Sequence, residues 1–254
     1  MLRAQRQERI LQALARKGIA TTEELMLAAG ISSATVRRDI NQLASMGLIE
    51  KVRGGARSLN PRTASEPTLS EKALRNAAEK KRIAREAVEH VAEGETIILD
   101  SGTTTLEVAK LLVRFSQLTV ITNDLRIALE VAQNTSNRLI FVGGTMRPGF
   151  CSSFGYLAEG MLEGLSADKI FLSVDAIDPE AGMMSFVTDD INLKRIGMRK
   201  ARETYLLCDR SKFGVKALFA LGMLEGITML IADDGVGAAT RRAFAQAGVN
   251  LRCV

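Results

Sequence analysis

The sequence of 254 residues has little histidine, cysteine or aromatic content, and each scarcity excludes a kind of chemistry. It has one histidine, His90, which speaks against zinc catalysis and leaves a Ser-His-Asp mechanism with a single candidate base. The helical pattern around it favours a role on a helix surface. Cys151, Cys208 and Cys253 are far apart and form no CxxC motif, so neither a zinc ribbon nor a disulfide framework is expected. We therefore predict no metal and no cofactor.

Long apolar runs are also missing, and charge of one sign is in excess in only one segment. No window approaches the ~20 apolar residues that a membrane span needs, and the polar start of the chain does not look like a secretory signal, so a cytoplasmic protein is expected. Residues 1–57 carry 10 Lys+Arg against 5 Asp+Glu, whereas residues 58–254 carry 24 of each. The net charge of +5 therefore belongs to the first segment and indicates a polyanionic partner, either nucleic acid or a membrane surface.

Residues 1–57 have the pattern of a compact helical unit. Apolar residues recur at helical spacing, and Gly18, Gly30 and Gly47 stand where helices would stop. Thr22 is the expected N-cap of the second helix. The expected elements are helices over residues 3–17, 22–29 and 32–46, an extended piece over 48–52 and a turn at 54–55.

The third predicted helix has the composition of a DNA-reading helix. Val36, Ile40 and Leu43 share one face, which leaves Arg37, Arg38, Asn41 and Ala34 on the opposite face. Arginine reads guanine and asparagine reads adenine in the major groove. The alternative is a solvated helix face on which the arginines pair with Asp39 or Glu24.

A glycine turn with basic shoulders follows this helix, as a DNA-binding wing requires. An RNA-binding or membrane-surface module is the competing interpretation. However, residues 1–57 contain no Phe, Tyr or Trp for base stacking and offer no large apolar face for lipid. The residues expected to contact DNA are Ser32, Ser33, Thr35, Arg37, Arg38, Asn41, Arg53, Gly54, Gly55 and Arg57.

A polar, proline-bearing stretch over residues 58–78 is expected to be a linker. Beyond it, over residues 79–254, helical patterns alternate with short apolar runs, which predicts an α/β domain with a largely parallel sheet covered on both faces. Ligands of such sheets bind at the carboxyl ends of the strands. Helices are expected over residues 79–92, 104–113, 124–133, 156–164, 189–202 and 237–247, and strands over 95–100, 118–122, 139–142, 169–174, 204–208, 226–231 and 249–253.

Polar residues gather at the predicted strand ends. The strand that ends at Asp100 runs into a loop with glycine and hydroxyl groups, 101–105, and then into a helix, which is the arrangement of an anion cradle. The alternative is an ordinary helix start. The other strand ends supply Thr122, Asn123, Gly143, Gly144, Arg147, Asp175, Asp209, Ser211 and Lys212, a set that suits a small polyhydroxylated anion.

The sequence resembles the DeoR-type bacterial transcription regulators along nearly its whole length. The resemblance is carried by the run from Ser33 to Ile40 (SATVRRDI), by Leu43, by GLI at 47–49 and by GGA at 54–56. It implies an N-terminal winged helix-turn-helix and a C-terminal sensor domain related in fold to ribose-phosphate isomerases and CoA transferases. The chain departs from the family pattern at 173–178, where SVDAID replaces Gly-x-Asp-Gly-Ile-Asp, and at 189–190, where an acidic pair stands in place of Glu.

The resemblance also implies a phosphorylated sugar or polyol as effector, and it adds Lys194 to the site. We expect a non-enzymatic DNA-binding repressor of a carbohydrate operon, acting as a homodimer or homotetramer. The alternative is a sugar-phosphate isomerase in which an aspartate is the base; the appended DNA-reading unit argues against it. The expected effector-binding residues are Asp100, Ser101, Gly102, Thr103, Thr104, Thr122, Asn123, Gly143, Gly144, Arg147, Asp175, Lys194, Asp209, Ser211 and Lys212.

Overall fold

The computed structural model describes residues 6–7, 9–10, 13–14, 17–45, 49–58 and 66–254. The chain divides into two compact units, Met1–Pro67 and Thr68–Val254. Within the described ranges, no helix is long and apolar enough to cross a membrane.

The N-terminal unit is a winged helix-turn-helix, as predicted. The described residues between 6 and 17 are helical, and Ile10 and Leu14 from this stretch are buried. The elements that follow are β1 (Ile19–Thr21), α2 (Thr22–Ala29), α3 (Ser33–Ser45), β2 (Ile49–Val52) and β3 (Gly55–Ser58). The strands form an antiparallel sheet in the order β1-β3-β2.

The core of this unit confirms the predicted inner face of the third helix. Val36, Ile40 and Leu43 are buried together with Leu25 of α2 and Ile49 of β2. The predicted end of that helix, 46–47, lies outside the described residues.

One predicted cap is wrong by a single position. The N-cap of α2 is Thr21, and Thr22 is the first helical residue. The Thr21 hydroxyl accepts a hydrogen bond from the Glu24 amide, while the Glu24 carboxylate accepts one from the Thr21 amide. This reciprocal capping box fixes the start of the helix, because it satisfies two amides that would otherwise have no partner.

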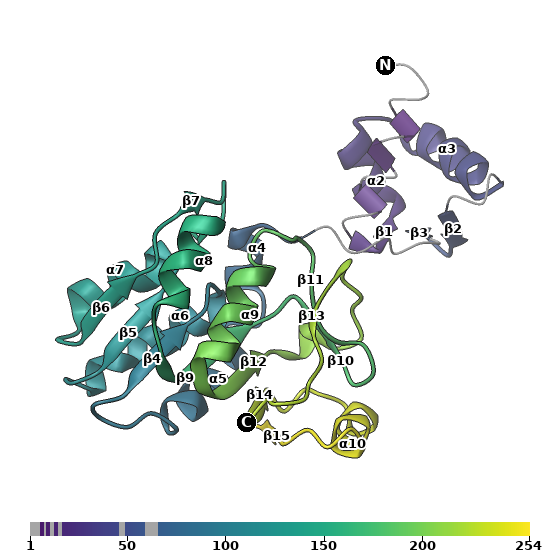
Figure 1. Ribbon diagram of the computed structural model, residues 1–254. Coiled ribbons are helices and arrows are strands. Elements are labelled where there is room, and N and C mark those ends of the chain that lie inside the picture. The colour runs from purple at the N-terminus through teal and green to yellow at the C-terminus, as the bar shows by residue number, and fades with distance from the viewer. Residues whose placement is uncertain (1–5, 8, 11–12, 15–16, 46–48, 59–65) are drawn as a thin grey trace. The chain divides into compact units, whose positions relative to one another are not determined.

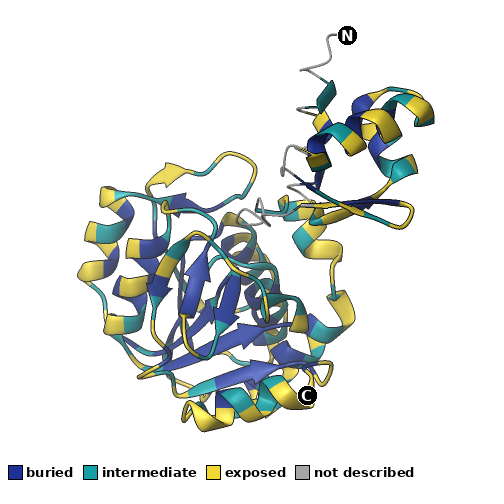
Figure 2. Ribbon diagram, turned by 90° about the vertical axis from the view of Figure 1, so that its right-hand side faces the viewer, coloured by how far each residue is buried: buried dark blue, intermediate teal, exposed yellow. Residues whose placement is uncertain are grey.

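The C-terminal unit is built on a seven-stranded parallel sheet (Figure 1). The strand order β15-β14-β12-β9-β4-β5-β6 confirms the predicted α/β architecture. In Figure 2 the inner strands of this sheet are mostly buried, as continuous apolar runs require, whereas the edge strands β6 and β15 are intermediate or exposed. The strands are β4 (Thr96–Leu99), β5 (Thr119–Thr122), β6 (Arg138–Phe141), β9 (Ala167–Ser173), β12 (Ala201–Cys208), β14 (Met229–Ala232) and β15 (Leu251–Cys253).

In the part of the chain that the structure describes, six helices cover the two faces of this sheet. One core is formed with α5 (Ala77–Val88), α6 (Thr103–Leu111) and α7 (Leu125–Asn134). The other is formed with α8 (Tyr156–Glu163), α9 (Ile191–Lys200) and α10 (Ala238–Gln246). Each helix lies within a few residues of its predicted range, because each carries an apolar face at helical spacing.

Several short elements were not predicted. A second, antiparallel sheet in the order β10-β11-β13 and a two-stranded hairpin, β7-β8, stand apart from the main sheet. Their strands are two to four residues long, too short for a clear alternation of apolar and polar residues. They are β7 (Thr145–Met146), β8 (Ser153–Phe154), β10 (Ala176–Asp178), β11 (Gly182–Ser185) and β13 (Phe219–Gly222), and 3-10 turns span Leu112–Arg114 and Arg210–Lys212.

The predicted linker is shorter than residues 58–78. Helix α4 (Leu69–Leu74) lies within that range, and α5 begins at Ala77. A capping box between Thr68 and Glu71 starts α4, which belongs to the C-terminal unit. The sequence pattern misled because a polar six-residue helix resembles a loop in composition. The remaining part of the predicted linker, 59–65, lies outside the described residues.

Candidate functional site

The outer face of α3 carries the predicted DNA-reading side chains. Arg37, Arg38, Asn41 and Ala34 are all exposed, opposite the buried stripe of the same helix. Among the described residues, neither guanidinium group has an ion-pair or hydrogen-bond partner. Two free arginines on the third helix of a helix-turn-helix have the chemistry and position to read base edges.

The carboxylates that could have neutralised these arginines are engaged elsewhere. Asp39 is buried and pairs with Arg6, whose Nε lies 3.0 Å from its Oδ2. Glu24 pairs with Lys17 at 2.8 Å. The alternative in which the arginines are bound to their neighbours is therefore wrong.

Three other predicted contacts already have partners within the chain. The Asn41 Oδ1 accepts a hydrogen bond from Lys51 Nζ at 2.8 Å. The hydroxyls of Ser32 and Thr35 are 3.0 Å apart and hydrogen-bonded. To bind adenine through both amide atoms, Asn41 would have to release Lys51, which is then free for a phosphate. Ser33, the first residue of α3, is half-buried.

The wing is the two-residue turn at Arg53-Gly54 between β2 and β3. Gly54 has a φ of +85°, and a Cβ on Gly55 would lie 2.1 Å from the Ala20 carbonyl oxygen, so close strand pairing requires glycine there. The two basic residues of the wing, Arg53 and Arg57, differ in whether they have a partner. Arg57 forms a fork of hydrogen bonds to Glu50 on the facing strand, whereas Arg53 is exposed and has no partner among the described residues.

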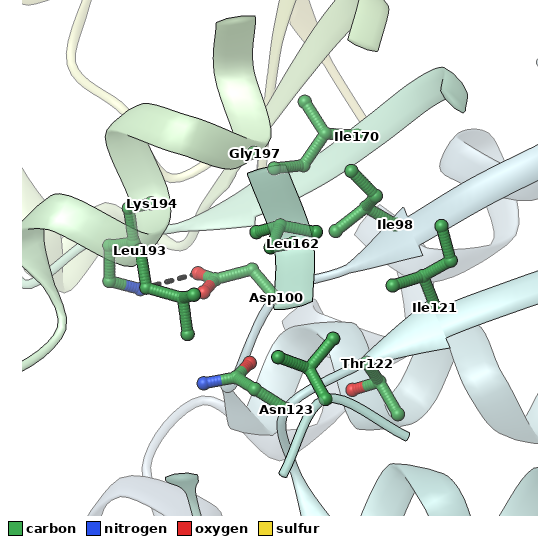
Figure 3. A pocket seen from close by; sticks show the side chains of 11 residues that line it. Ile98, Asp100, Ile121, Thr122, Asn123, Leu162, Ile170, Leu193, Lys194 and Gly197 are labelled. Carbon is green, nitrogen blue, oxygen red and sulfur yellow. Dashed lines mark hydrogen bonds and ion pairs between the residues drawn. The ribbon is translucent and has the colours of Figure 1, made fainter. Parts of the chain in front are cut away.

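At the carboxyl edge of the parallel sheet, Asp100 and Lys194 form a buried ion pair with 2.5 Å between Nζ and Oδ2 (Figure 3). The Ser173 amide also donates to Asp100, at 2.9 Å. Burial raises the pKa of Asp100 to about 6. Burial opposes the charge of Lys194, but Asp100 and Asp190 outweigh it and raise the pKa of the ammonium. Asp100 and Lys194, both predicted to bind the effector, therefore lie together and chiefly neutralise each other.

A small pocket lies beside this pair. Its volume of about 20 Å³ has room for a water molecule and is too small for a sugar. Figure 3 shows the Asp100 and Lys194 head groups at one side, with aliphatic side chains and Asn123 around them. The aliphatic lining consists of Ile98, Ile121, Val142, Leu162, Ile170 and Leu193.

The predicted anion loop is held by bonds within the chain. The Ser101 hydroxyl donates to Asp124 Oδ2 at 3.1 Å, and the Thr105 hydroxyl donates to the Gly102 carbonyl at 3.0 Å. A Cβ on Gly102 would lie 2.7 Å from Ser173 Oγ. Position 102 therefore requires glycine, because the backbone there packs closely against Ser173. Ser173 itself occupies a position where the family pattern has glycine. Thr104 is buried at the start of α6.

A second cluster of charges forms around Asp175. Lys72 Nζ lies 2.8 Å from its Oδ1, and the Ser185 hydroxyl donates to its Oδ2 at 3.2 Å. Although burial opposes its ionisation, the ammonium groups of Lys72 and Lys212 lower the pKa of Asp175 to about 2. Among the described residues, none accepts a hydrogen bond from the Lys212 ammonium, and burial lowers its pKa.

Asp209 lies beside the same cluster and acts electrostatically on Lys212. Its Oδ1 accepts hydrogen bonds from the Ser211 amide at 2.9 Å and from the Asn76 side-chain amide at 2.6 Å. Burial opposes its charge, but these bonds lower the pKa of the carboxyl group. Asp209 thereby fixes the turn that carries Lys212.

Arg147 reaches the same neighbourhood from the loop after β7. Its guanidinium carbon lies 3.9 Å from the centroid of the Phe150 ring, and Lys72 Nζ lies 5.4 Å from that centroid. Asp189 lies 3.7 Å from the Arg147 Nε. Lys72, Lys212 and Arg147 thus bring three cationic groups to the strand ends.

Other predicted residues serve the packing of the loops. The Asn123 amide donates to the Ser153 carbonyl at 2.9 Å, and the Thr122 hydroxyl accepts from the Asp124 amide. A Cβ on Gly144 would meet the Phe154 carbonyl oxygen at 2.7 Å, while one on Gly143 would have open space.

Sequence reasoning missed Lys72, Asn76 and Phe150. The first two fall in the stretch assigned as a linker. The Thr68-x-x-Glu71 spacing is the available signal for a helix start, and it places Lys72 on α4. Phe150 had no such signal, because it lies in a loop whose path depends on the β7-β8 pairing.

Comparison with known proteins gives matches over both units. The family model described as DeoR C terminal sensor domain matches residues 75–234, and that described as DeoR-like helix-turn-helix domain matches residues 6–62. The HTH-type transcriptional regulator GlpR of Haloferax volcanii is 34% identical over 251 residues, which cover 99% of this chain and 98% of that protein.

One further curated relative and one solved structure are also similar to the chain. The glycerol-3-phosphate regulon repressor of Escherichia coli K12 is 31% identical over 236 residues, which cover 92% of each chain. Among solved structures, ribose 5-phosphate isomerase A from Methanocaldococcus jannaschii is 18% identical, with a TM-score of 0.41 over 54% of this chain and 55% of that one.

Proposed function

The chain belongs to the DeoR family of DNA-binding transcriptional regulators, and from this premise we propose that it is a repressor released from its operator by a phosphorylated sugar or polyol. The observation that carries the effector proposal is the Lys212 ammonium, which lies at the strand ends without a hydrogen-bond acceptor among the described residues. Asp175 and Asp209 act on this ammonium electrostatically but accept no hydrogen bond from it, so its donors can serve a phosphate oxygen of the effector.

On the DNA side, we assign base reading to Arg37 and Arg38 and phosphate contact to Arg53. All three are exposed and have no carboxylate partner among the described residues. We assign Arg57 a smaller role in DNA binding than the sequence predicts, because Glu50 already pairs with it.

On the effector side, we assign the phosphate group to Lys212, with Lys72 and Arg147 beside it. Phosphate is well matched to such a cluster, since charge-assisted hydrogen bonds are the strong ones. Asp175 and Asp209 lie next to these cations and can accept hydrogen bonds from sugar hydroxyls. A relative is named a glycerol-3-phosphate regulon repressor, which fits an effector of this class.

We infer that the protein does not turn over its effector. The pKa values of Asp175 and Asp209 are lowered, which makes both carboxylates weak bases. The pKa of Asp100 is raised to about 6, but this carboxylate is buried against Lys194 beside a pocket too small for a sugar. Aldose–ketose interconversion by the purified protein at enzyme-like rates would contradict this inference.

We also propose that the chain works in the cytoplasm, where its DNA target is, and as a homodimer or homotetramer. A single small reading head contacts one half-site, so tight operator binding requires at least two heads on one particle.

The direct test is a thermal-shift panel of matched phosphorylated and free sugars and polyols on the full-length protein. A ligand that binds the native state alone raises the melting temperature. We expect at least one phosphorylated compound to raise it, its free counterpart to have no effect, and Lys212→Met to remove the rise. A panel in which free sugars act as well as their phosphates would overturn the assignment of the phosphate group.

A further inference from the structure

Helix α4 is bound to the strand-end site at two points, and the turn between α4 and α5 is bound to it at a third. Lys72 pairs with Asp175 at 2.8 Å, and Asn76, just after the helix, donates to Asp209 at 2.6 Å. The Thr103 hydroxyl lies 3.5 Å from the Lys72 carbonyl oxygen. The helix therefore contacts Asp175 and the first residue of α6, while Asn76, the N-cap of α5, contacts Asp209.

The carboxyl end of α4 is held tightly by a buried lysine. Lys80 Nζ donates to the carbonyl oxygens of Lys72 and Arg75. Burial lowers the pKa of Lys80 to about 8. Asn76 adopts the left-handed conformation with φ +52°, uncommon for a residue other than glycine. These contacts join α4 to the start of α5, so that a shift of Lys72 is transmitted to both.

The Lys72–Asp175 pair stands in direct competition with a bound anion. A phosphate at Lys212 would repel the carboxylate of Asp175 and attract the ammonium of Lys72, because Lys72 and Lys212 both act electrostatically on Asp175. In the complex, Lys72 could then pair with the phosphate in place of Asp175.

Resting on the proposed function, we propose that Lys72 is itself an effector ligand, which exchanges Asp175 for the phosphate group and so moves α4 when the effector binds. Helix α4 begins at Leu69, and the N-terminal unit ends at Pro67. Along the chain, α4 is thus the first element of the sensor unit after the DNA-reading unit. A displacement of α4 is a change at the attachment point of the reading head, which is what an effector must produce to alter operator binding.

The test uses the full-length protein with inorganic phosphate and glycerol 3-phosphate as probes. Affinity is measured by calorimetry, and amide hydrogen exchange is followed in the peptide over residues 68–76. The variants are Lys72→Met, Lys72→Arg and Asp175→Asn, with Lys81→Met as the matched control, because Lys81 is an exposed lysine of the next helix. Thermal unfolding of each variant checks that it is folded.

We expect Lys72→Met to weaken phosphate binding at least tenfold and to abolish the probe-induced change in exchange over 68–76. Lys72→Arg should keep most of both, and Lys81→Met should match the wild type. Asp175→Asn should bind inorganic phosphate several-fold more tightly, because a competing carboxylate is gone. A merely structural pair would instead make Lys72→Met and Asp175→Asn alike, with both losing stability and neither gaining affinity.

The outcomes separate this inference from the proposal beneath it. If the wild type binds neither probe and no phosphorylated compound of the thermal-shift panel raises its melting temperature, the proposed function fails and the inference falls with it. If a compound of the panel does raise it, that compound replaces the two probes. If the wild type binds a probe and Lys72→Met binds it equally well, or exchange over 68–76 is the same with and without probe, the inference alone is overturned. Should Lys72→Met fail to fold, the affinity of Asp175→Asn and the exchange of the wild type still decide.

Discussion

At the scale of single residues, the contrast between paired and unpaired arginines decides which side chains can act on DNA. Arg57 and Arg6 are engaged by Glu50 and Asp39, whereas Arg37 and Arg38 carry free charges on the exposed face of α3. Arg6 would have to break a pair with a buried carboxylate before it could bind DNA, whereas Glu50 is an exposed partner that offsets part of the charge of Arg57.

Changing Arg37 or Arg38 to alanine is expected to weaken operator binding by about 1–3 kcal/mol each, the range of a bidentate base contact. Gel-shift titration against an operator selected from a random DNA pool measures this loss. Arg85→Ala is the matched control, because Arg85 is an exposed helix arginine of the sensor unit. Equal affinity of Arg37→Ala, Arg38→Ala and the control would show that the pair is solvated surface.

Asp175 gives a pH dependence with a defined sign. Its pKa is about 2 in the folded protein against about 3.9 in an unfolded chain, so its charge stabilises the fold above about pH 4. That contribution, on the order of 2–3 kcal/mol, is lost as the pH falls from about 4 to 2.

Chemical unfolding of the wild type and of Asp175→Asn across this range isolates the contribution. The wild type should be the more stable of the two near neutral pH, and the difference should shrink as the solution becomes acidic. A difference that stays constant down to pH 2 would show that the Lys72–Asp175–Lys212 cluster does not set this pKa.

At the scale of elements, the long helices and the buried parallel strands could be predicted from the sequence, and the pieces between them could not. Helices such as α3 and α7 carry an apolar face through several turns, which no other structure buries as well. Strands β11 and β13 pair although they lie far apart in the chain, with Ser185 facing Phe219. No local pattern contains that pairing.

The candidate site follows the same division. The ends of the predicted strands indicate which aspartates, lysines and hydroxyls lie at one edge of the sheet, because parallel strands end together. The sequence pattern does not indicate which partner each of these side chains takes. Asp100 meets Lys194, while Asp175 meets Lys72 from a segment that composition alone assigns to a linker. Pairing is a property of packed geometry and is not encoded in the spacing of the residues.

Gly55 in the wing gives a prediction at this scale. A methyl group there would collide with the Ala20 backbone at 2.1 Å and force β1 away from β3. We expect Gly55→Ala to destabilise the N-terminal unit by about 1–3 kcal/mol or more, as overpacking does, and to abolish operator binding. Effector binding by the sensor unit should be unaffected.

Gly143→Ala is the control for this change, because a Cβ at Gly143 meets nothing within 4 Å. Calorimetric unfolding and gel-shift titration compare the two variants. Wild-type operator affinity in Gly55→Ala would contradict the account of the wing.

At the scale of the whole molecule, the distribution of charge matches the division into two units. The net charge of +5 lies in residues 1–57, and the remainder is neutral. We expect operator affinity to fall steeply with salt, because binding to DNA phosphates releases counterions. Anion binding at the strand ends depends on a few local cations and should be less sensitive to salt. Similar salt slopes for the two equilibria would argue against separate roles for the units.

Assembly belongs to the same scale. If two reading heads must act together, light scattering of the purified protein should give a mass of at least twice the 27.5 kDa of one chain. A mass of one chain at concentrations where operator binding is complete would contradict the proposed oligomer.

The central claim is that a small phosphorylated ligand at the strand ends controls DNA binding by the winged unit. It is tested most directly by titrating operator DNA with the wild type and with Lys212→Met, each with and without the phosphorylated compound that shifts the melting temperature most. The account predicts that the compound weakens operator binding by the wild type, and that Lys212→Met binds the operator equally well but no longer responds. Operator binding by the wild type that is the same with and without the compound would contradict it.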